Sequence, residues 1–130
     1  MPTAKRFLGF LAFASVTTAF TYSLALPVCN AVFRCGCKAF WWGGASHCRY
    51  MPGMPGVEHP CPWCDIGAWF YLIPVAASAI AVATTFRWRR SLPVRVTVAF
   101  AVAVALMAIE ATIHGLVVEY PRGLPGLFNS

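Results

Sequence analysis

Residues 96–118 read VTVAFAVAVALMAIEATIHGLVV, an apolar run in which Glu110 and His114 are the ionisable side chains. A helix needs about 20 mostly apolar residues to cross the hydrocarbon core of a bilayer. Two further runs meet that requirement, FLGFLAFASVTTAFTYSLAL at 7–26 and IGAWFYLIPVAASAIAVATTF at 66–86. The sequence therefore predicts an all-α integral membrane protein with three transmembrane helices, forming a single membrane domain of 130 residues.

The composition agrees with a membrane protein. Hydrophobic residues make up 59% of the chain and charged residues 11%, whereas roughly 25% of residues are charged in a soluble domain. The net charge of +6 comes from lysines and arginines near the ends of the apolar runs. That placement is typical of topology signals and not of a nucleic-acid-binding stripe. We expect the lipid bilayer as a partner and no nucleic acid.

Basic residues also predict the orientation, because cytoplasmic segments carry an excess of lysine and arginine. A cytoplasmic N-terminus places six basic residues inside (Lys5, Arg6, Arg87, Arg89, Arg90, Arg95) and four outside (Arg34, Lys38, Arg49, Arg122). The sequence thus predicts a cytoplasmic arginine-rich turn at 87–95, with the loop 27–65 and the C-terminus extracytoplasmic. An alternative is that residues 1–25 form a cleaved signal peptide. The length of the first run favours a permanent span.

The loop between the first two runs holds all six cysteines, in the stretch CNAVFRCGCKAFWWGGASHCRYMPGMPGVEHPCPWC at 29–64. Proline and glycine are frequent there, so little regular structure is expected. A loop of this length without a core needs disulfides, a metal or a partner to hold it. Cysteines on an oxidising face favour disulfides first, although the sequence does not choose among the pairings.

Metal binding is the second interpretation of the loop. Two close thiol pairs, Cys35-Gly36-Cys37 and Cys61-Pro62-Trp63-Cys64, are suited to a tetrahedral ion such as zinc. Thiolate and thioether donors together favour Cu(I) over harder ions. The candidate ligands for copper or zinc are Cys35, Cys37, His47, Cys48, Met51, Met54, His59, Cys61 and Cys64.

Thiol–disulfide chemistry through Cys61 and Cys64 is the third interpretation, because the thiol pKa falls readily in a C-x-x-C pair and thiolate is the reactive form. The stretch Pro60 to Cys64, placed before a second span, resembles the outward P-C-x-x-C of bacterial membrane quinone-linked disulfide oxidases. The resemblance covers those residues and the preceding topology. It implies a redox role for the pair. That family has four spans where this chain has three, so the chain is not assigned to it.

Glu110 and His114 lie four residues apart and therefore share one face of the third helix. Ionisable residues inside a bilayer are costly and indicate either function or subunit contact. We expect the pair to face protein and not lipid, near the end of the helix that carries the cysteine loop. Aromatic residues on that side are predicted to act as interfacial anchors, Trp63 and Tyr120 among them.

The sequence contains no phosphate-binding glycine loop, nucleophile elbow or metalloprotease motif. The aromatic stretch Phe40-Trp41-Trp42 and the slim, alanine-rich helices give the chain more apolar surface than it can bury by itself. We therefore predict a small non-catalytic subunit or accessory factor of a larger membrane complex, such as a respiratory or metalloenzyme complex. Its partners would be other membrane subunits or further copies of the chain. The alternatives are the membrane thiol–disulfide redox protein and a copper- or zinc-handling membrane protein.

Overall fold

The computed structural model describes residues 2–128, apart from the side chains at positions 2, 3, 5 and 6. Within that part of the chain every regular element is a helix or a helical turn. The side chains of Lys5 and Arg6, two of the charges used to predict the orientation, lie outside the described residues.

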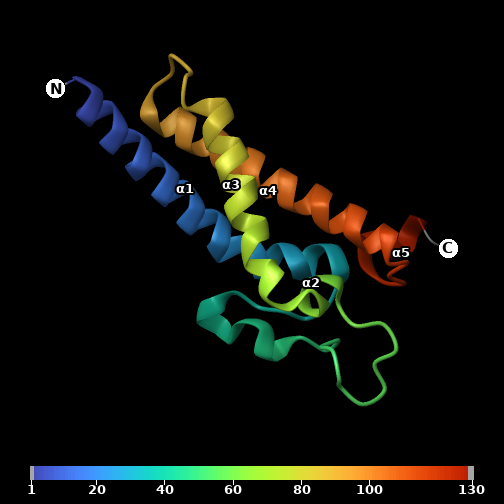
Figure 1. The fold of residues 1–130 in the computed structure, drawn as a ribbon. Coiled ribbons are helices and arrows are strands. Elements are labelled where there is room, and N and C mark those ends of the chain that lie inside the picture. The colour runs from blue at the N-terminus through green and yellow to red at the C-terminus, as the bar shows by residue number, and fades with distance from the viewer. Residues whose placement is uncertain (1, 129–130) are drawn as a thin grey trace.

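Three helical segments are long and apolar enough to span a membrane, namely Phe7–Phe33, Gly67–Thr85 and Leu92–Val117. The first belongs to α1 (Pro2–Phe33). The second joins a 3-10 helix (Gly67–Tyr71) to α3 (Leu72–Thr85), and the third is α4 (Leu92–Val117). Figure 1 shows α1 and α4 running in the same direction and α3 running the opposite way. Three apolar helices, with the cysteine-rich region between the first two, were predicted and are confirmed.

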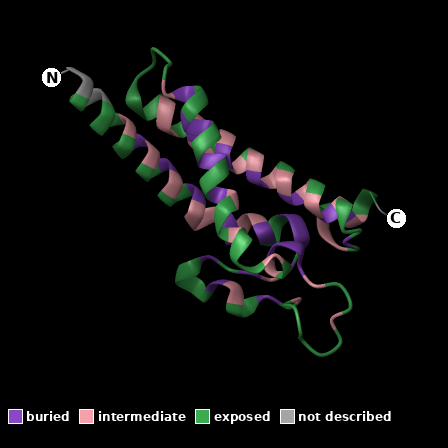
Figure 2. Cartoon of the chain, in the orientation of Figure 1, coloured by how far each residue is buried: buried purple, intermediate pink, exposed green. Residues whose placement is uncertain are grey.

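The helices pack through narrow stripes of buried residues. On α4 the stripe repeats every four residues and consists of Ala99, Ala103, Met107, Ala111 and Gly115. Residues four apart lie on one face of a helix, and small side chains let helix backbones approach closely. Each long helix consequently packs against both of the others, with the buried faces turned inward (Figure 2).

The boundaries of α1 and of the arginine-rich turn differ from the prediction. α1 continues through Pro27 to Phe33, past the predicted end of the first span at residue 26. Proline removes one helical hydrogen bond, but the residues that follow bury an apolar face and keep the helix intact. At the other end of the bundle, α4 begins before Arg95, whose guanidinium lies 5.2 Å from the ring centre of Phe13 and 5.0 Å from that of Phe86. Arg95 is therefore part of a helix and not of the turn.

The cysteine loop, residues 34–61, lies at the end of the bundle where α1 and α4 finish (Figure 1). Short helical turns at Phe40–Trp42 and Gly44–His47 and the four-residue α2 (Pro62–Asp65) are its regular parts. The short α5 (Gly123–Phe128) packs against α1 and α4 at the same end. Trp63 and Tyr120 are each only 1% exposed, so these two predicted interfacial anchors belong to the core.

Candidate metal centre

Cys29 belongs to the site because it continues the buried stripe of α1. The stripe begins at Phe13 and repeats every four residues through Thr17, Thr21 and Ala25, all of them buried. The same spacing directs Cys29 into the bundle, where it is fully buried. Sequence reasoning left Cys29 out of the ligand set, which was built on the two close thiol pairs Cys35/Cys37 and Cys61/Cys64. The four-residue spacing was the signal that could have found it.

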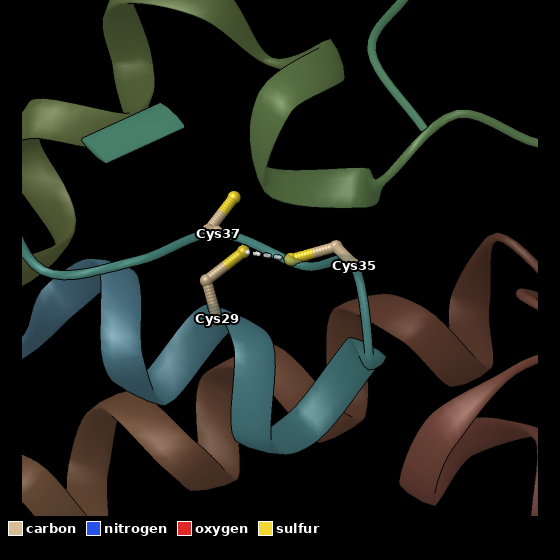
Figure 3. Close-up of side chains that lie close together, drawn as sticks. All are labelled: Cys29, Cys35 and Cys37. Carbon is tan, nitrogen blue, oxygen red and sulfur yellow. Dashed lines mark hydrogen bonds between the residues drawn. The ribbon is translucent and has the colours of Figure 1, made fainter. Parts of the chain in front are cut away.

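The chain reverses sharply after α1 and brings the next cysteine back against the helix. Arg34 has a left-handed backbone (φ 53°) and its N–H donates to the carbonyl oxygen of Asn30 at 2.8 Å. Gly36 (φ 89°) donates its N–H to Oδ1 of Asn30 at 2.7 Å. As a result the sulfur atoms of Cys29 and Cys35 point toward one another at 3.4 Å (Figure 3). Glycine is needed between the two loop cysteines because this backbone region disfavours other residues.

Backbone hydrogen bonds join the three loop segments that carry the remaining cysteines. The N–H of Arg49 donates to the carbonyl oxygen of Cys35 at 2.8 Å. The N–H of Cys61 donates to the carbonyl oxygen of Tyr50 at 2.7 Å. Cys48, next to Arg49, is therefore held between the C-x-C and C-x-x-C segments.

Six sulfur atoms converge as a result. Besides the Cys29–Cys35 contact, the sulfur of Cys29 lies 3.5 Å from that of Cys61, and the sulfur of Cys64 lies 3.6 Å from that of Cys48. Two groups of three have all their sulfurs within 4.8 Å of one another, Cys29 with Cys35 and Cys37, and Cys37 with Cys48 and Cys64.

All six cysteines are free, and five of them are buried while Cys64 is partly exposed. A disulfide requires a sulfur–sulfur distance of about 2.05 Å. The sulfurs of Cys29 and Cys35 are 3.4 Å apart and all six cysteines are free, so the disulfides expected for the loop are absent from the structure. The loop is held instead by its backbone hydrogen bonds and by burial of the thiols among apolar side chains.

The close packing of the thiols lowers the pKa of some of them and raises the pKa of others. Hydrogen bonds from the thiols of Cys29 and then Cys37 lower the pKa of Cys35. Hydrogen bonds from Cys29, Cys37 and Cys61 lower the pKa of Cys64. Burial, the largest cause, raises the pKa of Cys48 to about 11. A cation that binds these thiols would have to displace their protons, because metal-bound cysteine is thiolate.

The other predicted ligands lie in different places. His47 packs its ring over Gly43 and is exposed, as are Met54 and His59. Neither histidine belongs to either group of three, among the residues that the structure describes. Met51 lines a pocket of about 350 Å³ together with Cys29 and Cys64. Among the predicted ligands other than cysteine, Met51 is therefore the one that lies beside the cluster.

Two buried polar atoms near the cluster lack a hydrogen-bond partner, the hydroxyl oxygen of Tyr120 and one terminal nitrogen of Arg122. The guanidinium of Arg122 lies 4.1 Å from the ring centre of Tyr50. Burial, followed by the negative charge of a Cys61 thiolate, raises the pKa of Tyr120. An unpaired donor and a cation at this place suit an anionic neighbour such as a set of metal-bound thiolates.

The pair formed by Glu110 and His114 is connected to the C-x-x-C segment through a hydrogen bond from Trp63. The indole Nε1–H of Trp63 donates to Oε2 of Glu110 at 2.8 Å, and Oε1 of Glu110 lies 3.6 Å from Nδ1 of His114. Trp63 lies between Cys61 and Cys64 and packs against Phe33, with ring centres 6.0 Å apart. The sequence did not indicate this hydrogen bond, because it joins residues 47 positions apart.

Residues of the Glu110–His114 pair also line a groove and a small cavity. Glu110 and His114 line a mostly apolar groove of about 650 Å³ between α3 and α4. His114 additionally lines a small cavity of about 90 Å³ with His59 and Asp65 of the loop segment. The pair therefore has a protein partner in Trp63 on one side and open apolar space on the other.

No protein-family model, curated protein or solved structure was found to match this chain.

Proposed function

We propose that this chain is an integral membrane protein that binds a soft metal ion through its cysteine cluster and serves as a non-catalytic accessory subunit of a larger membrane assembly. The observation that carries the metal site is the convergence of six free thiols, with contacts of 3.4–3.6 Å between neighbouring sulfurs. A tetrahedral ion with metal–sulfur bonds of about 2.3 Å separates its sulfur ligands by about 3.8 Å. The sulfurs are thus already close to the spacing that a metal ion requires.

The donor set narrows the choice of metal. Thiolate sulfur is a soft ligand that selects Cu(I) or zinc over magnesium, calcium or manganese. The thioether of Met51 beside Cys29 and Cys64 adds a further soft donor and favours Cu(I). The pocket lined by these residues provides an access route, and the unpaired Tyr120 and Arg122 groups provide partners for the negative charge of bound thiolates.

Exposed aromatic side chains support the accessory role. Trp41, Trp42 and Trp69 are 63%, 69% and 70% exposed. Large exposed apolar side chains beside apolar helices indicate contact with lipid or with another subunit. The cytoplasmic N-terminus and extracytoplasmic cysteine loop remain the proposed orientation, on the strength of the basic residues counted in the sequence.

Metal content tests this proposal directly. The full chain, purified in detergent under reducing and anaerobic conditions, should bind Cu(I) or Zn(II) in competition with a chelator. Cys37→Ser, which removes the sulfur shared by both groups of three, should weaken binding strongly. Met54→Leu, at an exposed loop position, should bind as wild type does. Equal binding by the two variants, or no binding by wild type, would contradict the proposal.

A thiol–disulfide function through the C-x-x-C pair is the second candidate. It is favoured by one observation: Cys64 is partly exposed and its sulfur lies 3.6 Å from that of Cys48. Oxidation of the purified protein followed by intact-mass analysis distinguishes the two functions. A reversible disulfide that involves Cys64, in a chain that binds no metal, would favour the redox function.

A further inference from the structure

The cluster contains more thiols than a single ion binds. A structural zinc site uses four ligands in a tetrahedron, whereas six free cysteines gather here. One ion would leave at least two thiols without a role in a region where five of the six are buried. The sulfurs instead divide into two groups of three that have Cys37 in common.

We propose that the cluster binds two thiophilic ions bridged by the thiolate of Cys37. This inference rests on the proposed metal-binding function and specifies how many ions the site takes. Three sulfurs around an ion with bonds of about 2.3 Å lie about 4.0 Å apart, and each group of three fits within 4.8 Å. A thiolate sulfur keeps lone pairs after binding one soft ion, so Cys37 can bind a second.

The two proposed metal sites differ in how deeply their cysteine ligands are buried. Cys29 and Cys35 are 0% exposed and Cys37 is 2% exposed, and the sulfur of Cys61 lies 3.5 Å from Cys29 as a possible fourth donor. This inner site resembles a closed structural metal site. It is framed by the last turns of α1 and the C-x-C turn. The sulfurs of Cys29 and Cys35 face one another, and Cys37 lies beside them (Figure 3).

The outer site consists of Cys37, Cys48 and Cys64. Cys64 is partly exposed and lines the 350 Å³ pocket that also contains Met51. A metal site with three protein ligands and an open position can accept a further ligand. The outer ion is therefore the exchangeable one, and the thioether of Met51 is placed to assist its transfer.

Stoichiometry is the decisive measurement. The full chain in detergent, reduced and kept anaerobic, is titrated with Cu(I), and the bound ions are counted by native mass spectrometry. We expect two Cu(I) ions per wild-type chain and one in Cys48→Ser, which lacks an outer ligand only. Wild type challenged with a Cu(I) chelator should lose one ion well before the other. X-ray absorption should detect copper–copper scattering in wild type and not in Cys37→Ser.

The outcomes separate this inference from the function on which it rests. One ion bound to wild type, with no change in Cys48→Ser, would refute the two-ion site and leave the metal-binding function standing. No bound ion in wild type would refute both. If Cys48→Ser loses its helical circular dichroism, the wild-type count and its copper–copper scattering decide the matter alone.

Discussion

Replacing Trp63 by phenylalanine tests whether its hydrogen bond to Glu110 secures the cysteine segment. The indole N–H lies 2.8 Å from the carboxyl oxygen, and the ring is 1% exposed. The hydrogen bond is part-buried and its acceptor is a carboxylate, and losing a bond of this kind costs about 1–3 kcal/mol. The smaller ring also gives up about 1 kcal/mol of packing against Phe33 and Phe70. We therefore expect Trp63→Phe to lower the free energy of unfolding by about 2–4 kcal/mol.

Denaturant unfolding of the reduced, metal-free protein in detergent micelles measures this free energy, with tryptophan-independent circular dichroism as the signal. Trp41→Phe is the matched control, because Trp41 is 63% exposed and should change stability by less than about 0.5 kcal/mol. Glu110→Gln keeps an acceptor for the indole and should cost less than Glu110→Leu.

A double-mutant cycle isolates the contact itself. Trp63→Phe combined with Glu110→Leu should show a coupling energy of about 1–2 kcal/mol, since the two single variants remove the same hydrogen bond. Equal effects of Trp63→Phe and Trp41→Phe, or a coupling energy near zero, would refute the view that this bond ties the loop to α4.

Further predictions concern backbone geometry, helix packing and topology. Gly36→Ala should destabilise the chain by about 1–2 kcal/mol and weaken metal binding, measured by unfolding and metal titration, because φ is 89° there. Gly115→Ala should lower the unfolding free energy by about 1–3 kcal/mol, since a Cβ at this position would lie 2.9 Å from the Phe33 ring. Gly9→Ala is the control, because a Cβ at Gly9 would have no atom within 4 Å, and this variant should be neutral or slightly stabilising. In a cysteine-free background, Ser91→Cys should resist an impermeant thiol reagent in intact cells, and labelling there would reverse the proposed orientation.

The end of α1 illustrates how far sequence reasoning extended. Length and hydropathy predicted the first span from residue 7, and the structure agrees. The predicted span ended at about residue 26, whereas the helix continues through Pro27 to Phe33. A proline inside a helix costs about 3 kcal/mol or more, so other interactions must offset that cost. Burial of the residues after it decides whether the helix continues, and that burial depends on the neighbouring helices.

The metal ligands also divide into those that the sequence predicted and those that only the structure revealed. The sequence identified Cys35, Cys37 and the C-x-x-C pair as close thiols, because their proximity follows from local spacing. It also proposed His47 and His59, which the structure leaves exposed and outside the two groups of three. Donor type alone does not determine which side chains turn inward, since the loop's own turns set their direction.

Three long apolar helices, with a cysteine-rich stretch between the first two, can be predicted from the sequence alone. Both are properties of contiguous residues, because membrane-spanning length depends on a local run of apolar side chains. Only the tertiary structure decided that six sulfurs meet, that Cys29 is among them, and that Trp63 reaches Glu110. These contacts join segments far apart in the chain, and they depend on how the helices pack and on hydrogen bonds between loop backbones, which no local pattern encodes.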